Sequence, residues 1–178
     1  MAEQEGAVGV DDQAGNGMAG NGADEMPQVG VLTQYVKDLS FENPNSPAVY
    51  QWTAQPQIDV QFNIGAQPVG QDVHEVALRI DITARGDSGV AFRAELLYAG
   101  LFALRNVPEE QLQPFLYAEA PRILFPFARR VIADMVSDGG FPPLLLDPID
   151  FGALYMQRAA QVQATESGGQ AADTTGIA

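Results

Sequence analysis

Hydrophobic and polar residues alternate in four runs along the first hundred residues, which is typical of strands with one buried and one solvated face. The first run is Val31–Glu42. The apolar positions of the next three runs are Ile58, Val60, Phe62 and Ile64, then Val76, Leu78, Ile80 and Ile82, then Phe92, Ala94, Leu96 and Tyr98. Gly86-Asp87-Ser88-Gly89 between the last two runs predicts a hairpin turn. The alternation therefore predicts a small four-stranded antiparallel sheet.

The first run predicts a strand with an acidic solvated face, although Val36 and Lys37 interrupt its alternation. We expect one face to carry Val31, Thr33, Tyr35, Leu39 and Phe41. We expect the other to carry Gln34, Asp38, Ser40 and Glu42. Prolines follow at positions 44 and 47 and end the strand, because proline cannot donate to a sheet ladder. The segment Ala48–Pro56 is then interpreted as a crossover that carries Tyr50 and Trp52.

In the second half, apolar residues recur every three or four positions, which predicts helices. Pro108-Glu109-Glu110 is typical of a helix start. An amphipathic helix is predicted from Pro121 to Gly139-Gly140, with a kink or restart at Pro126. Its apolar face is Leu124, Phe125, Ala128, Val131, Ile132 and Met135. After the apolar loop Phe141–Leu146, we expect Asp147 to cap a shorter closing helix over Pro148–Gln161. Strands followed by helices predict an α+β fold.

Composition limits the predicted domain to residues 31–160. Residues 1–30 contain seven glycines and six acidic residues, and residues 161–178 consist mainly of small and polar residues. Neither segment can bury enough apolar surface to offset the entropy of ordering it, so both are expected to be disordered tails. The net charge of −14 argues against a nucleic-acid partner. The absence of cysteine agrees with a reducing compartment. We find neither a membrane-spanning run nor a secretory signal.

Candidate catalytic chemistry is scarce. The segment Gly86–Gly89 matches a serine-protease nucleophile motif, but Ser88 would need His74, the only histidine, as its base. No orienting carboxylate is recognisable, so we interpret the segment as a turn and His74 as a polar residue at a strand edge. The acid pairs Asp134/Asp138 and Asp147/Asp150 bracket helix ends, and capping explains the second pair. The sequence predicts no enzyme, no metal site and no cofactor.

Large apolar residues also occur where a small core does not obviously need them. The crossover holds Tyr50 and Trp52, and the loop and closing helix hold Phe141, Leu144, Leu145, Leu146, Phe151, Leu154 and Tyr155. Such a surplus indicates an oligomer interface or an exposed binding groove. Ordinary core packing with scattered surface hydrophobes is the alternative, and the residues by themselves leave both open.

Three separated blocks resemble the SecB protein-export chaperones. They are Asp38-Leu39-Ser40-Phe41-Glu42 with Pro44-Asn45 and Pro47, Ile123-Leu124-Phe125-Pro126-Phe127-Ala128-Arg129, and Phe141-Pro142 with Leu144, Leu146, Pro148, Phe151 and Ala153-Leu154-Tyr155-Met156. The resemblance runs from about Val31 to Ala160. It implies a cytoplasmic homotetramer, built as a dimer of dimers with helices between the sheets. It also implies a chaperone without a cofactor that binds unfolded secretory precursors and delivers them to the SecA ATPase.

The resemblance also implies roles for individual residues. Docking of SecA is expected at Asp38, Glu42 and Glu95. Binding of clients is expected at Trp52, Ile58, Val60, Phe62, Phe141, Tyr155 and Met156. Tetramer assembly is expected at Phe92, Ala94, Leu96 and Tyr98. Arg93 departs from the family, which often has a hydrophobic residue two positions before the docking glutamate. The alternative function is that of a SecB-like chaperone dedicated to one partner, such as a toxin–antitoxin system.

Overall fold

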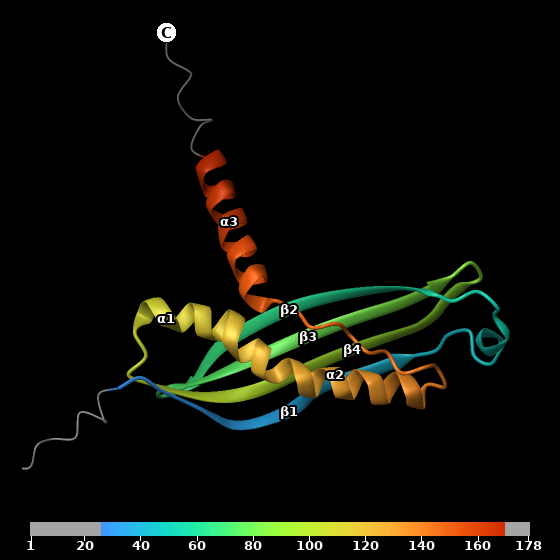
Figure 1. Cartoon of the computed structure of the whole chain (residues 1–178), viewed down its shortest axis with the longest axis horizontal. Helices are drawn as coiled ribbons and strands as arrows, with labels where there is room; N and C mark the ends of the chain where they lie inside the picture. Colours follow the sequence, from blue (N-terminus) through green and yellow to red (C-terminus); the bar gives the residue numbers. More distant parts are fainter. Residues whose placement is uncertain (1–25, 170–178) are drawn as a thin grey trace, which may run out of the picture.

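The computed structural model describes residues 26–169, with side chains as far as Val162. Residues 1–25 and 170–178, which fall in the two predicted tails, lie outside this part. The described chain has the predicted α+β fold. Its four strands are β1 (Gln28–Glu42), β2 (Gln57–Gly70), β3 (Val73–Gly86) and β4 (Gly89–Arg105). They form one antiparallel sheet in the order β1-β4-β3-β2, so β1 and β2 are its edges (Figure 1).

The helices follow the strands in the chain. A short 3-10 helix, η1 (Ala48–Gln51), lies in the crossover between β1 and β2. After β4, α1 (Glu109–Pro114), the π-helical segment η2 (Phe115–Glu119) and α2 (Ala120–Asp138) follow without a gap. The closing helix α3 (Phe151–Gly169) projects away from the sheet (Figure 1).

Proline alters this long helix at a different place from the one predicted. The π-helical turn lies just before Pro121, where the Ala120 N–H bonds to the Phe115 carbonyl. The predicted restart at Pro126 is wrong, because α2 continues through it. Leu124 and Ala128 on either side are fully buried, and this packing holds the helix together across the missing hydrogen bond.

Helix α2 ends at Gly139-Gly140, as predicted. Gly140 has a φ of 81°, and its N–H bonds to the Ser137 carbonyl while the Phe141 N–H bonds to the Val136 carbonyl. These two bonds form a Schellman cap, which needs the left-handed conformation that glycine adopts at little cost. The cap turns the chain back over the sheet at Phe141.

The start of α3 differs from the prediction. Its N-cap is Asp150, whose Oδ1 accepts the Ala153 N–H at 2.9 Å, and not Asp147. The carboxylate three residues later makes the cap, because Asp147 and Pro148 still belong to the segment without regular secondary structure between α2 and α3. The helix then extends to Gly169, past the expected end at Gln161, and β1 begins before Val31. The described secondary structure therefore begins before residue 31 and continues past residue 160.

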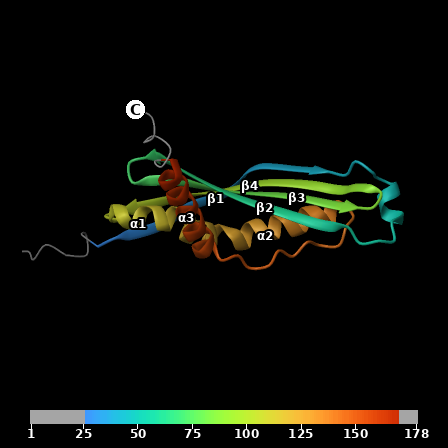
Figure 2. The same ribbon diagram turned by 90° about the horizontal axis from the view of Figure 1, so that it is seen from above.

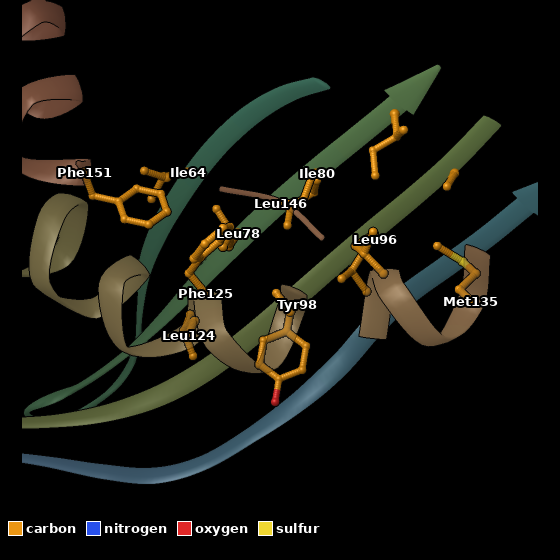
Figure 3. Packing of buried hydrophobic residues seen from close by; sticks show 14 of the residues in the cluster. Ile64, Leu78, Ile80, Leu96, Tyr98, Leu124, Phe125, Met135, Leu146 and Phe151 are labelled. Carbon is orange, nitrogen blue, oxygen red and sulfur yellow. The ribbon is translucent and has the colours of Figure 1, made fainter. Parts of the chain in front are cut away.

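The helix and sheet pack as two layers (Figure 2). Helix α2 lies along one face of the sheet, called here the inner face, and buries the side chains of the central strands β3 and β4 (Figure 3). Residues that are at most 2% exposed in this core include Leu78, Ile80, Phe92, Leu96, Leu124 and Ile132. Gly100 permits this close approach, since a Cβ there would lie 2.8 Å from a Leu124 methyl carbon.

The core also contains the residues expected at the subunit contact. The four residues assigned to tetramer assembly, Phe92, Ala94, Leu96 and Tyr98, are all buried within this one chain. They lie on the inner face beneath α2, where Figure 3 shows Leu96 and Tyr98 among core side chains. Because the chain's own helix covers them, these side chains belong to the core of the protomer. Their role in assembly stays a prediction.

Strand β1 contains two irregularities that sequence alternation does not resolve. The register with β4 shifts between Val31 and Thr33 and again between Val36 and Asp38, which leaves Leu32 and Lys37 without a partner in the ladder. Each β-bulge reverses the alternation of faces. Thr33 and Tyr35 therefore share the outer face with Asp38, and not the inner face with Leu39 as predicted.

A buried carboxylate on the outer face holds the second bulge. Glu75 of β3 accepts hydrogen bonds from the Tyr35 hydroxyl, from Lys37 Nζ at 2.8 Å and from Gln67 Nε2 at 2.7 Å. Tyr35 and Lys37 reach it across β4, where Ala99 leaves room. The bonds from Lys37 and Tyr35 lower the pKa of Glu75 below its ordinary 4.5, although burial opposes this. The bond to Glu75 raises the pKa of Tyr35 to about 12.

We expect Glu75→Gln to lower the free energy of unfolding at pH 7 by about 2 kcal/mol, since the charged hydrogen bonds are lost. Because the folded-state pKa of Glu75 is depressed, its stabilisation is present above the unfolded pKa and disappears as the pH falls through the folded pKa. The difference between wild type and variant should therefore shrink below about pH 4.5. Urea unfolding at one chain concentration measures this. Glu119→Gln, at an exposed ion pair, is the control and should change stability little.

Candidate functional site

The first candidate site is a hollow between α3, η2 and the inner face of β2, called here the helix hollow. It has a volume of about 360 Å³, within the range of small-ligand pockets. Its lining is mostly apolar and consists of Phe62, Ile64, Gln113, Tyr117, Leu154, Tyr155, Arg158, Ala159 and Val162. Phe125 of α2 supports it, with edge-on ring contacts to Phe62 at 6.2 Å and to Phe151 at 5.7 Å.

Helix α3 supplies five of these nine residues. Leu154 is one of them, and Tyr155, Arg158, Ala159 and Val162 are spaced by three and four residues, so they lie on one side of the helix. Arg158 also donates a long hydrogen bond to the Phe62 carbonyl at 3.4 Å, which places its guanidinium beside β2. Sequence reasoning missed Val162 because it assigned this residue to the tail, although the spacing from Tyr155 is helical.

The second candidate site, called here the crossover hollow, lies beside the start of β2. It has a volume of about 320 Å³ and brings together residues that are far apart in the chain. Trp52 and Pro56 come from the crossover, and Phe141 and Pro142 follow α2. Tyr50 fixes this arrangement: its hydroxyl donates to the Gly139 carbonyl at 2.9 Å, and its ring lies 5.6 Å from that of Phe141.

Strand β2 connects the two hollows. Ile58 and Val60 lie on the same face as Phe62, between Pro56 at one hollow and Phe62 at the other. Six residues of extended chain span about 20 Å. The structure thus brings Trp52 together with Phe141, and Phe62 together with Tyr155. Ile58 and Met156 line neither hollow and are exposed at the surface.

The acidic candidates lie on the opposite side of the sheet. Glu42 pairs with Arg93 in the β1–β4 register, and Ser40 pairs with Glu95, so Asp38, Glu42 and Glu95 share the outer face. This face also carries cations that contact the acids. Arg93 lies 3.6 Å from Glu42, and Arg79 lies 3.4 Å from Glu95. Sequence reasoning did not identify Arg79, because its cross-strand neighbour is set by the register of β3 and β4.

A third surface runs along the edge strand β1 and the adjoining side of α2. Val36, Leu39 and Phe127 are each more than 40% exposed, and Val29, Val31 and Leu32 continue the row. Leu39 and Phe41 also line a hollow with Val131 and Met135 of α2. Contiguous apolar exposure of this kind indicates a surface that another polypeptide covers.

The candidate hydrolase pair does not come together. Ser88 lies in the β3–β4 turn, whereas His74 lies near the start of β3, twelve residues before the strand's end at Gly86. An extended strand of that length spans about 40 Å, far beyond hydrogen-bond reach.

Within residues 26–169, no helix is long and apolar enough to cross a membrane.

Comparisons with known proteins agree with one another. A family model described as preprotein translocase subunit SecB matches residues 22–162. The protein-export protein SecB of Zymomonas mobilis is 65% identical over 151 residues, covering 83% of this chain and 92% of that protein. The SecB of Sphingopyxis alaskensis is 63% identical over 148 residues, covering 83% and 86%.

The fold has a counterpart among solved structures. A Mycobacterium tuberculosis SecB-like chaperone, solved in complex with an antitoxin peptide, superposes with a TM-score of 0.56 at 16% identity. The match covers 68% of this chain and 90% of that one. At this identity the likeness concerns the fold alone. The family model and the relatives that are more than 60% identical lead to one conclusion: the chain belongs to the SecB family of protein-export chaperones.

Proposed function

We propose that this protein holds unfolded precursor proteins in an export-competent state and delivers them to the SecA ATPase. One observation carries the proposal. Two hollows lined largely by apolar residues, one beside the start of β2 and one at its middle, lie on either side of the apolar residues Ile58 and Val60, in a chain that is 65% identical to a protein-export protein SecB. The proposed site of action is the cytoplasm, where precursors are present before export.

The chemistry of this groove suits an unfolded client. Aromatic and aliphatic side chains recognise apolar area without requiring a particular sequence. A folded protein buries such area, whereas an unfolded segment exposes it. An extended segment of about seven residues would span the roughly 20 Å between the hollows. Trp52, Phe141, Phe62 and Tyr155 are the proposed anchors, and Ile58, Val60 and Met156 would contact the client between or beside them.

The proposed division of labour assigns SecA to the other side of the sheet. Asp38, Glu42 and Glu95 are exposed there and would attract a basic surface. Since the proposed client residues lie on or beside the inner face, a client and SecA could be bound at the same time. That arrangement is what transfer from a holding chaperone to a motor requires.

We also propose that four copies assemble as a dimer of dimers. The support comes from the exposed apolar row on β1 and from the position of this strand at the edge of the sheet. An exposed edge strand with apolar side chains would otherwise favour uncontrolled association, so a defined partner is expected to cover it. The neighbouring side of α2, with Phe127, extends the same surface.

A chaperone dedicated to one toxin–antitoxin partner is the alternative function. The structural neighbour bound to an antitoxin peptide shares 16% identity with this chain, against 65% for the export protein. A holding assay separates the two functions. Slowed refolding of several unrelated unfolded proteins supports the export chaperone, and activity toward one partner alone would overturn it.

Replacing Tyr155 with Ser should weaken client binding about tenfold, equivalent to about 1.4 kcal/mol, because the side chain is an aromatic anchor of the helix hollow. The measurement is the Kd of an unfolded client, together with native mass to verify that assembly is unchanged. The neighbouring exposed residue provides the control, Gln157→Ser, which should leave the Kd unchanged. If Tyr155→Ser and wild type bound the client with equal affinity, Tyr155 would not be part of the client-binding groove.

Reversing charge with Asp38→Lys should weaken SecA binding by tenfold or more while client holding stays intact, since the two surfaces lie on opposite faces. Binding of purified SecA and a refolding assay measure the two activities. The control is Asp147→Lys, the same change in an exposed loop residue outside the acidic face. If Asp38→Lys impaired client holding as much as SecA binding, the division of surfaces would be wrong.

Native mass tests the proposed assembly. Four chains of 19.0 kDa predict a mass of about 76 kDa. Replacing Val36 with Asp should reduce it, because a charge would be buried in the subunit contact. The control is Val69→Asp, which places the same charge at a similarly exposed valine beside the β2–β3 hairpin. An unchanged mass for Val36→Asp, or a monomeric wild type, would contradict the proposed interface.

A further inference from the structure

Two of the three acidic residues proposed for SecA docking already form ion pairs with arginines of this chain. Glu42 contacts Arg93 across the β1–β4 pair, with the guanidinium nitrogen 3.6 Å from the carboxylate oxygen. Glu95 contacts Arg79 of β3 at 3.4 Å. Asp38 differs: its Oδ1 accepts the Leu39 backbone N–H at 3.0 Å, and it makes no ion pair within residues 26–169. The acidic face is thus unevenly neutralised.

The sheet register makes these contacts a property of the fold. Arg93 lies directly opposite Glu42 on β1, and Arg79 lies one strand further in, diagonal to Glu95. Arg79 also contacts Asp81 on its own strand at 3.4 Å. Cross-strand neighbours on one face are within reach of long side chains, so both arginines contact the acids without leaving the sheet.

Such exposed ion pairs contribute little to stability, but they oppose binding of a cationic partner. A basic side chain that approaches Glu42 or Glu95 meets a carboxylate whose charge is partly neutralised, and it must compete with the guanidinium. The same arginine also repels the incoming cation. Both effects act on the partner's affinity and are screened by salt.

We propose that Arg93 and Arg79 determine how tightly the acidic face binds its partner: they hold Glu42 and Glu95 in ion pairs that a basic partner surface must displace. This inference rests on the proposed docking of SecA at this face. It assigns Asp38 the role of the carboxylate that a partner engages without competition. The two arginines keep the complex weak enough to separate after a client has been transferred.

Replacing either arginine tests the inference. Arg93→Gln and Arg79→Gln should each tighten binding of purified SecA about two- to fivefold at low salt, the range that exposed ion pairs contribute. At about 1 M salt, where the Debye length is about 3 Å, the gain should disappear. A purely structural role for the arginines would not produce this dependence on salt. Because both side chains are exposed, the thermal midpoint should stay close to that of wild type.

The matched control is Arg122→Gln. Arg122 also forms an exposed ion pair, with Glu119 on the helix, so the variant changes net charge equally at a place away from the acidic face. It should not alter the affinity for SecA. If it tightened binding as much as Arg93→Gln, general charge would explain the effect and the inference would be overturned.

Two further results are decisive. Unchanged or weaker binding by both Arg93→Gln and Arg79→Gln overturns the inference, and weaker binding would mean that the arginines contact acids of the partner. Asp38→Lys in the same series tests the docking face separately. If Asp38→Lys reduces SecA binding while the arginine variants have no effect, the proposed docking face is supported and only the proposed role of the arginines is wrong. If it too has no effect, the proposed docking face itself is wrong.

Discussion

The width of one helix relative to four strands determines most of this structure. A helix with its side chains is about 10–12 Å across, whereas four strands spaced by about 4.8 Å form a wider sheet. Helix α2 therefore covers β3 and β4 and leaves the inner faces of both edge strands only partly covered. On β3 and β4 the inner residues are buried, but Val36 and Leu39 on β1 and Ile58 on β2 remain exposed. Both margins are apolar, and these are the surfaces that we propose for assembly and for clients.

The second constraint is that the outer face has no covering layer, so it must be polar. Here the bulge at Lys37 is decisive, because it keeps Asp38 and Glu42 on the outer face while Leu39 and Phe41 point inward. Glu75 fixes the bulge through Lys37 and Tyr35. A one-residue shift without the bulge would exchange the acidic and apolar sets. The fold thus separates a charged surface from an apolar one across the thickness of a single strand.

The crossover hollow depends on contacts between distant segments. Phe141 lies against Tyr50 of the crossover and Phe92 of β4, because the Schellman cap at Gly140 turns the chain back toward the sheet. Tyr50 in turn binds the carbonyl of Gly139. The position of Trp52 therefore depends on where α2 ends. A hollow built in this way is held open by the fold, as the proposed binding of clients without prior rearrangement requires.

The sequence predicts the α+β class, the four strands, the stop at Gly139-Gly140 and, through three residue blocks, the family. These features are local: alternation, helical spacing, glycine and proline each leave a mark within a few residues. It did not determine the bulges in β1, the cap at Asp150 or the burial of Phe92 and Tyr98 under the chain's own helix. It also gave no sign that Arg79 reaches Glu95. These features depend on the register between strands and on which layer covers which face, and both are set by contacts between residues far apart in the chain.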